Sequence, residues 1–510
     1  MNPEQTFKWI KEHIKQEWKL AFLSAFILGL LIHMPIMLSD IPNHDGLDSM
    51  YFDQNMITSG RWFLTVACGI SSYYTLPWLI GLLSVFYLGL TSVVLTEFLQ
   101  VKSKACIVLI SGLLVSFPAT ASTFAYVFTM DGYMLALFLA VLSVLLTQRF
   151  RFGFLAGAVC LACSMGTYQA YLPFAVLLCI YGILMLAMEE GKLAEKLQKG
   201  LKYLYMGILG VGLYYVLLQI LLKLQHKELA SYQGINGMTS LEGAGLLQTV
   251  KQIYSDFISF TLKGNVLWNN VYSGAAIAVL VLLTAVTLFS LVIRRKWWKN
   301  LWFYLIMVLL VVGLPIATNL ILIISPEVTY HLLMRYQWVL YLICMLAFVE
   351  KYGSRKAVNS WGLLLSAGVL VFNFTVTDQI GYSNLQKRYE KTYAYCVRLL
   401  DRIEQTEGYY QGIPIAMIGV VGDEEYPQTD ITQTVTGGMI GLSGDSLVYT
   451  GKNYQAFIKH YLGATLNILP AEAMEEAYYQ EFYRDMPGFP AAGSIQIVDG
   501  IMYIKTENAQ

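Results

Sequence analysis

The residues best suited to chemistry lie in one polar stretch between the first two hydrophobic segments. Four aspartates and a Gly-Arg-Trp tripeptide occur there: Asp40, Asp45, Asp48, Asp53 and Gly60-Arg61-Trp62. A carboxylate accepts the proton of an attacking hydroxyl group, and an arginine binds phosphate through a forked set of donors. Because a bilayer penalises charge, this stretch is a candidate reaction site at a membrane surface. The alternative is a solvated loop in which aspartate only forms turns.

Other polar residues are candidates for substrate contacts, namely His44, Asp131, Tyr168, Gln169, Tyr232, Gln233 and Arg335. Each has a structural alternative. Asp131 suits a helix N-cap, and Arg335 suits either phosphate binding or an extended position at the membrane surface. His44 is an acid–base group, a metal ligand or a hydrogen-bonding loop residue. Gln169 is expected at the membrane interface, where it could hydrogen-bond a sugar.

Tyr232 and Gln233 lie in a glycine-containing segment that suits an exposed loop beside a ligand, or a simple surface turn. The sequence has no nucleophile elbow, no phosphate-binding Gly-Lys-Ser/Thr loop, no His-Glu-x-x-His and no Asp-x-Asp. A cytoplasmic enzyme that uses a nucleotide sugar is therefore disfavoured. A sugar carried on a lipid phosphate fits the aspartates and arginines better.

The composition places these residues in a multi-span membrane protein. Of the 510 residues, 56% are hydrophobic and 13% are charged, and the mean hydropathy is +0.53. About eleven apolar runs approach the length of a membrane-spanning helix. They cover residues 20–38, 76–98, 106–127, 134–147, 154–166, 171–188, 203–222, 273–293, 302–324, 336–349 and 358–375.

Basic residues concentrate in every second loop, which predicts the orientation. Lys102 and Lys104, Arg149 and Arg151, and the 294–296 run belong to one set of loops. The positive-inside rule assigns these loops and the N-terminus to the cytoplasm. The aspartate loop then lies outside, and an odd number of spans also places the C-terminus outside. The first span has no small-residue cleavage site, so we expect it to remain as a helix.

The sequence becomes polar from about Thr377. We expect an amphipathic helix at 384–407, a buried strand at 413–421, a second helix at 471–485, and a hairpin of 494–498 with 501–505 joined by Asp499-Gly500. The predicted fold is an all-α membrane domain of residues 1–376, followed by a small extracytoplasmic α/β domain of residues 377–510.

Several motifs together resemble those of the GtrII-type glucosyltransferase family. The resemblance rests on the aspartate loop, Gly60-Arg61-Trp62, the Gly-Thr-Tyr168-Gln169 turn and the chain length. It implies a bacterial, GT-C-like membrane enzyme that uses a polyprenyl-phosphate sugar outside the cytoplasmic membrane. It also implies an acidic catalytic base in the first outer loop, matched best by Asp45 and next by Asp48. Asp45 precedes Gly46 and is not part of a consecutive acidic pair, so both carboxylates remain candidates.

The sequence thus predicts an inverting transfer of a hexose, glucose by the resemblance, to a cell-surface glycan acceptor. Asp45 would accept the proton while Arg61 or Arg335 neutralises the departing lipid phosphate. The scheme requires no cofactor, although clustered aspartates can bind a divalent metal. The expected partners are the lipid bilayer, the polyprenyl-phosphate donor, the glycan, and a donor-synthesising enzyme and flippase. No nucleic acid is expected.

Two alternatives remain open, a lipid-sugar flippase or other transporter and a polysaccharide polymerase. A transporter is expected to carry charged residues at mid-membrane. Here the centres of the spans are nearly free of Asp, Glu, Lys and Arg, and the charges gather at one face. This favours surface chemistry over transport, but it does not separate a transferase from a polymerase.

Overall fold

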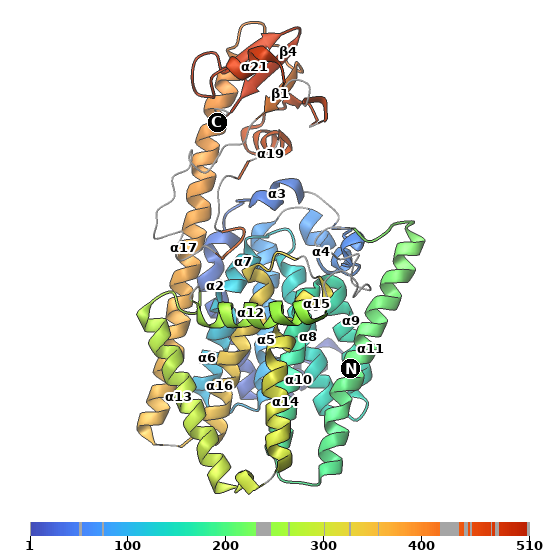
Figure 1. Ribbon diagram of the computed structural model, residues 1–510, viewed down its shortest axis with the longest axis vertical. Helices are drawn as coiled ribbons and strands as arrows, with labels where there is room; N and C mark the ends of the chain where they lie inside the picture. Colours follow the sequence, from blue (N-terminus) through green and yellow to red (C-terminus); the bar gives the residue numbers. More distant parts are fainter. Residues whose placement is uncertain are drawn as a thin grey trace.

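The computed structural model describes residues 2–49, 54–73, 76–230, 246–263, 266–299, 301–325, 328–354, 356–418, 438–442, 447–448, 451–470, 472–474 and 479–506. Upright apolar helices form a bundle, and the C-terminal domain lies at one end of it, here called the cap end (Figure 1). In the membrane region the elements are α1 (Pro3–His13), α2 (Gln16–Met37), α3 (His44–Ser49), η1 (Ile57–Ser59), α4 (Leu64–Tyr73), α5 (Pro77–Leu99), α6 (Lys104–Ser116), α7 (Pro118–Phe124), α8 (Met130–Arg149), α9 (Gly153–Thr167), η2 (Gln169–Tyr171), α10 (Leu172–Met188), α11 (Leu193–Leu224), α12 (Leu246–Leu262), α13 (Val271–Arg294), η4 (Trp297–Lys299), α14 (Leu301–Thr318), α15 (Ile321–Ile324), η5 (Leu332–Trp338) and α16 (Val339–Tyr352).

Within the described residues, nine helices are long and apolar enough to cross a membrane, and the bent pair α6–α7 makes a tenth. The shorter apolar helix α9 coincides with the predicted span at 154–166. Each of the predicted spans therefore corresponds to an apolar helix or a bent pair of helices. The prediction of an all-α, multi-pass membrane protein is confirmed.

Contacts among the helix ends show that the basic loops meet at the end opposite the cap. Lys15, before α2, and Arg149, at the end of α8, both pair with Glu97 at the end of α5, at 2.7 and 3.2 Å. Beside them, the Glu350 carboxylate at the end of α16 accepts a hydrogen bond from the Ser103 amide at 3.0 Å. The predicted alternation of basic and non-basic loops thus corresponds to the two ends of the bundle.

Two irregularities shape the bundle. Helices α6 and α7 are bent by 46° at Phe117, which is extended because it precedes Pro118. Helices α13 and α14 diverge from their junction at η4 (Figure 1): α13 packs on α16 and α17, whereas α14 packs on α10 and α12. Helix α12 lies across the upright helices near the cap end (Figure 1).

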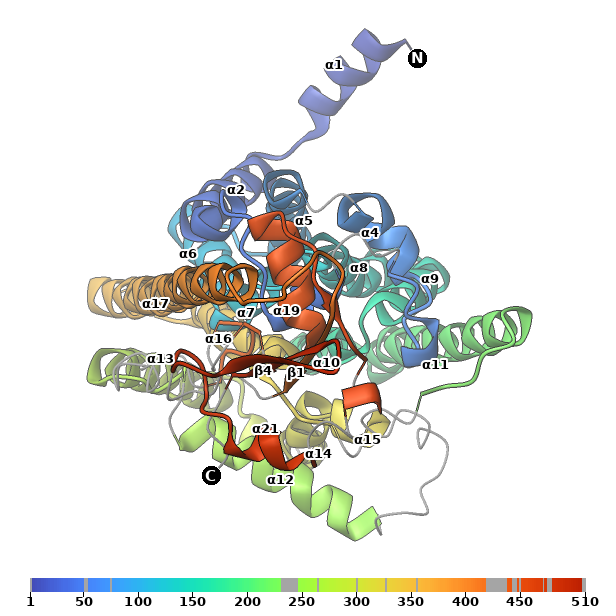
Figure 2. The same ribbon diagram turned by 90° about the horizontal axis from the view of Figure 1, so that it is seen from above.

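The C-terminal domain is joined to the bundle by one continuous helix. Helix α17 (Ala357–Glu404) contains both the last predicted span and the predicted amphipathic helix, so it crosses the expected domain boundary at 376 without a break. Seen from above, the small domain lies over the bundle (Figure 2). Its elements are β1 (Pro414–Ile418), α19 (Gly451–Phe457), η7 (Ile458–Leu462), β2 (Asn467–Ile468), α21 (Glu481–Asp485), β3 (Ile495–Val498) and β4 (Ile501–Lys505).

The small domain contains one sheet of order β2-β1-β4-β3. Strand β1 is parallel to β2 and β4, and β3 and β4 form the predicted antiparallel hairpin. Its turn residues Asp499 and Gly500 have φ values of 51° and 79°, as a two-residue turn of this kind requires. The helix predicted at 471–485 is interrupted, because Gln480 is extended and α21 begins only at Glu481.

Candidate functional site

Two of the sequence motifs pack directly against each other at the cap end. The Phe63 amide, next to Gly60-Arg61-Trp62, donates to the Gly166 carbonyl at 2.7 Å. The Trp62 indole covers Gly166 so closely that a Cβ at Gly166 would lie 2.5 Å from the ring. Glycine is needed here because nothing larger allows this approach. Segments far apart in the sequence thus form one structural unit.

Buried polar side chains hold the Gly60 turn from its other side. Gln169 Nε2 donates to the Ser59 carbonyl at 2.9 Å and to the Tyr214 hydroxyl at 3.1 Å. Tyr214 in turn donates to the Gly60 carbonyl at 3.1 Å. Gln169 is only 7% exposed, which differs from the predicted interfacial position. Its two amide hydrogens are engaged by the protein, so it positions the turn and has no donor left for a sugar.

Arg61 extends from this turn to a row of stacked tyrosines. Its Nη1 donates to the Tyr133 hydroxyl at 3.1 Å, and its guanidinium carbon lies 5.1 Å from the centre of the Tyr168 ring. Tyr133 and Tyr168 stack at 4.2 Å, and the row continues through Tyr171 to Tyr336 with centroid separations of 5.4 and 6.3 Å. We call Tyr133, Tyr168, Tyr171 and Tyr336 the tyrosine row. It holds the Arg61 cation against aromatic faces.

Asp131 lies in the first turn of α8, two residues before Tyr133. The N-cap of this helix is Thr129, so Asp131 does not occupy the predicted N-cap position. It is 2% exposed, and its Oδ1 accepts a hydrogen bond from the Gly132 amide at 2.9 Å. A negative charge in the first helical turn interacts favourably with the helix dipole. The carboxylate therefore stabilises the element that carries Tyr133.

Arg335 is paired with a carboxylate that the sequence analysis did not identify. Its two terminal nitrogens donate to the two oxygens of Asp256 on α12, each at 2.7 Å. Its Nε donates to the Tyr330 carbonyl at 3.1 Å, and the guanidinium lies 3.8 Å from the centre of the Tyr330 ring. The Arg335 side chain is 9% exposed, so it is neither extended to the membrane surface nor an unpaired cation. This bidentate pair joins α12 to η5.

Asp45 is exposed on the short helix α3. The helix is anchored by Leu47, which is 3% exposed, and it packs against α19 of the C-terminal domain. The predicted base is therefore accessible at the junction between the bundle and the cap. The side chains of His44 and Asp48, together with residues Asp53, Tyr232 and Gln233, lie outside the described part of the chain.

Two titratable groups interact across the same junction. Burial raises the pKa of the Asp40 carboxyl above its ordinary value, and the nearby His460 partly offsets this effect. Burial, followed by the neighbouring Lys459, lowers the pKa of the His460 imidazole, and Asp40 acts in the opposite direction. The charges of Asp40, before α3, and of His460, in η7, therefore influence each other across this junction.

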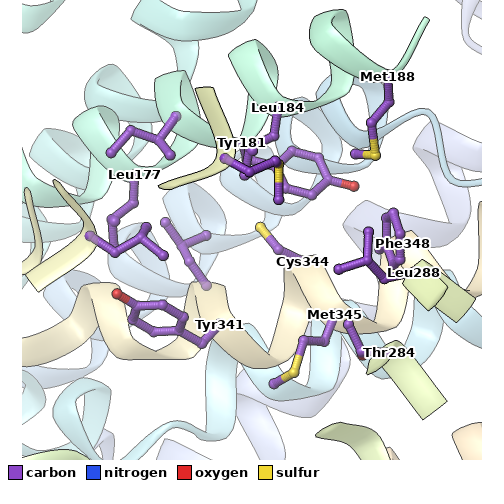
Figure 3. A pocket seen from close by; sticks show the side chains of 14 residues that line it. Leu177, Tyr181, Leu184, Met188, Thr284, Leu288, Tyr341, Cys344, Met345 and Phe348 are labelled. Atoms are coloured by element: carbon purple, nitrogen blue, oxygen red, sulfur yellow. The ribbon is translucent and has the colours of Figure 1, made fainter. Parts of the chain in front are cut away.

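An elongated apolar cavity of about 280 Å³ lies inside the bundle, between α10, α13, α14 and α16 (Figure 3). Along α10 its lining runs from Leu177 to Met188, which is about 16 Å at 1.5 Å per residue. Two polar groups in its wall are bonded elsewhere: Thr284 donates to a carbonyl of its own helix at 2.8 Å, and the Tyr341 hydroxyl bonds Thr318 at 2.6 Å. The buried Tyr181 hydroxyl, which also lines the cavity, has no hydrogen-bond partner among the described residues. Such a wall suits a hydrocarbon ligand.

The cap end of this cavity adjoins the Arg335 site. The Thr318 carbonyl accepts hydrogen bonds from the Tyr330 hydroxyl at 3.3 Å and from Gln337 Nε2 at 2.8 Å. Tyr330 is also the ring on which the Arg335 guanidinium stacks. Hydrogen bonds through Tyr341, Thr318 and Tyr330 thus connect the wall of the apolar cavity to the charged and aromatic Arg335 site.

Asp256 was missed because residues 246–262 are not among the predicted apolar spans and were not assigned to a helix. The apolar residues of 246–262 recur at helical spacing, and Asp256 is the only acidic residue among them. These two observations could have indicated an amphipathic helix with one inward carboxylate. Tyr214, Tyr133 and Tyr330 gave no comparable signal, because tyrosines are abundant throughout the chain.

The fold and site define a multi-pass membrane protein with an apolar cavity below a charged, aromatic site at one end of the bundle. A model of the glucosyl transferase GtrII family matches residues 34–350. This is more than half of the chain, and the protein belongs to that family, which confirms the predicted resemblance. It is therefore a membrane glycosyltransferase. A comparison with curated proteins and with solved structures gave no match.

Proposed function

We propose that this protein transfers glucose from a polyprenyl-phosphate donor to a cell-surface glycan at the outer face of the cytoplasmic membrane. The family match supports the sugar transfer. The observation that carries the choice of donor is the apolar cavity, whose cap end adjoins charged and aromatic groups. A lipid-linked sugar has the same two parts, a hydrocarbon chain and a phosphate.

The size and position of the cavity fit part of an isoprenoid chain. A protein cavity of about 150 Å³ holds one benzene molecule, so about 280 Å³ accommodates roughly two five-carbon units. Helices α13 and α14 both line the cavity, and α12 lies across the upright helices near the cap end. The remainder of a long chain would stay among the membrane lipids.

Arg61 is the better candidate for the phosphate. Arg335 already forms a bidentate ion pair with Asp256 at two 2.7 Å contacts, and Arg61 lies over the Tyr168 ring within the Gly60-Arg61-Trp62 segment. In the proposed reaction the acceptor hydroxyl oxygen bonds to the anomeric carbon and the bond from that carbon to the phosphate oxygen breaks. The electron pair leaves with the phosphate, which Arg61 stabilises, and Asp45 accepts the hydroxyl proton. One displacement inverts the anomeric carbon.

The cap end is proposed to face outward, because the basic loops lie at the opposite end. A donor-synthesising enzyme and a flippase would then supply the lipid-linked sugar at that face. Reporters fused after Lys104 and after Lys299 should be cytoplasmic, and a reporter fused after Gln405 should be outside. A cytoplasmic reporter at Gln405 would place Asp45 on the wrong side for this reaction.

The direct test uses purified protein with polyprenyl-phosphate glucose labelled in the sugar. Free polyprenyl phosphate should appear only when a glycan acceptor is present, and UDP-glucose should not replace the donor. Arg61→Lys keeps the charge but loses the forked donors, so its transfer rate should fall. Movement of labelled lipid across vesicles without acceptor-dependent release would favour a flippase, and chain extension by whole repeat units would favour a polymerase.

A further inference from the structure

Asp378 is a buried acidic residue that the proposed reaction does not use. It lies on α17, is 0% exposed, and neither of its carboxyl oxygens has a hydrogen-bond partner among the described residues. Buried polar groups nearly always have partners, and an unpaired buried carboxylate is strongly unfavourable. Such a group in a native fold indicates a ligand, an ordered water or a protonated carboxyl.

Two hydroxyl groups that interact electrostatically with Asp378 are committed to other acceptors. The Val115 carbonyl can only accept, so it binds a hydrogen on His33 Nε2 at 2.9 Å. Nδ1 of the neutral ring is then the acceptor for the Tyr382 hydroxyl at 2.6 Å. The Tyr336 hydroxyl likewise donates to the Leu114 carbonyl. Both phenols are close enough to interact electrostatically with the Asp378 carboxyl, yet neither has a hydrogen left for it.

The neighbouring break between α6 and α7 carries more unpaired polar atoms. The hydroxyls of Ser116 and Ser122, on either side of the start of α7, are buried without a hydrogen-bond partner among the described residues. Helix α7 packs against α17 and η5. Broken helices at membrane depth occur where they are buried in protein or line a polar cavity. Unpaired groups on adjacent elements therefore point to a ligand with several hydroxyl groups.

We infer that Asp378 binds two neighbouring hydroxyl groups of the hexose during transfer, an inference that rests on the proposed function. A carboxylate accepts two such hydrogen bonds, one at each oxygen. Tyr336, which interacts electrostatically with Asp378, is also the last member of the tyrosine row, and Arg61 lies at the other end of that row. The tyrosine row thus connects Arg61, which is proposed to bind the phosphate, to Asp378, which is proposed to bind the sugar hydroxyls.

The C-terminal domain covers this site from the cap end. One turn beyond Asp378, a Cβ on Gly381 would lie 3.0 Å from Leu442 and 3.5 Å from Met439. Asn384 Nδ2 also donates to the Leu442 carbonyl at 2.8 Å. These contacts join the C-terminal domain to the turns of α17 that follow Asp378.

The test compares wild-type protein, Asp378→Asn and Asp378→Ser with a panel of polyprenyl-phosphate glucose donors, each lacking one sugar hydroxyl. The wild type should lose about 10- to 100-fold in kcat/KM when a bound hydroxyl is missing, as expected for a hydrogen bond to a charged group. Both variants should be slow with the complete donor and should no longer discriminate against that deoxy donor. Asp401→Asn, an exposed carboxylate on the same helix, should keep the wild-type pattern.

The outcomes separate this inference from the proposed function. If Asp378→Asn lowers turnover of all donors by the same factor, or leaves the wild-type pattern intact, Asp378 does not bind the sugar. If the wild type does not use the complete donor at all, the proposed function fails first. Should one variant unfold on purification, the second variant supplies the comparison. If a folded variant is inactive, the affinity of each deoxy donor is measured instead, from its competition with the complete donor for binding.

Discussion

Gly60→Ala probes the packing between the Gly60-Arg61-Trp62 segment and the turn that contains Gln169. At Gly60, φ is +73°, and an added Cβ would lie 2.6 Å from both Gln169 Nε2 and Tyr214 Oη. A non-glycine residue in the left-handed region costs about 1–2 kcal/mol. Displacing one of these buried groups from its hydrogen bond costs about 1–3 kcal/mol more. We therefore expect Gly60→Ala to destabilise the fold by about 2–5 kcal/mol.

Two matched glycine substitutions separate strain from contact. Gly412 has φ +91° but nothing within 4 Å of an added Cβ, so Gly412→Ala should cost only the backbone strain of about 1–2 kcal/mol. Gly207, inside α11, has ordinary φ and open space, so Gly207→Ala should stabilise the protein slightly, by about 0.5–1 kcal/mol. From most to least stable, the expected order is Gly207→Ala, wild type, Gly412→Ala and Gly60→Ala.

Unfolding can be followed by thiol labelling on heating, because Cys106 and Cys396 are buried and not in disulfides. Transfer should also fall in Gly60→Ala, since misplacing Arg61 by about 1 Å is enough for a 10²-fold loss. Equal unfolding temperatures for Gly60→Ala and Gly412→Ala would show that displacing Gln169 and Tyr214 adds no cost to the backbone strain. A normal transfer rate in a destabilised Gly60→Ala variant would show that the position of Arg61 does not matter for the reaction.

Three further predictions concern charged groups. Asp45→Asn should lower transfer about 10²- to 10⁴-fold at saturating donor without changing the unfolding temperature; if Asp45→Asn and Asp48→Asn both stay active, the base lies elsewhere. Arg335→Met and Asp256→Leu should each destabilise the protein more than the double variant does, because each leaves one partly buried charge unpaired; purely additive effects in thermal unfolding would contradict this pairing. The folded state lowers the pKa of His460, so its stabilising contribution is present above its ordinary pKa of 6.5 and is lost as the pH falls through the lowered value. Protease resistance of the C-terminal domain should therefore decline from pH 7 towards pH 5, and His460→Gln should flatten that decline; an unchanged pH profile in the variant would exclude His460.

The membrane topology could be predicted because it depends on long apolar runs and on alternating basic loops. The hairpin at Asp499-Gly500 could also be predicted, because few other residue pairs adopt its backbone conformation. The length of α17 could not, since its polar half is stabilised by contacts with the C-terminal domain that leave no signal in hydropathy. Residues 384 and 381 provide such contacts.

The candidate site was predicted only in part, for a physical reason. Sequence patterns identify residue types that can perform chemistry, so Arg61 and Tyr168 were found. They do not reveal which partner occupies a donor or an acceptor. Gln169 was expected to face a sugar but is bonded to Ser59 and Tyr214. Asp378 lies just past the last predicted span, where a carboxylate is expected in water, and only packing shows that it is enclosed.

The unbroken helix α17 makes the C-terminal domain a rigid extension of the membrane domain. Its 48 residues span about 70 Å at 1.5 Å per residue, so the height of the small domain is set by residue count and not by a flexible tether. Each inserted residue would rotate the domain by about 100° and raise it by about 1.5 Å. The number of residues in α17 thus fixes both the height and the orientation of the C-terminal domain above the membrane domain. A single alanine inserted into the polar half of α17 would turn β1 to β4 away from the face they now cover.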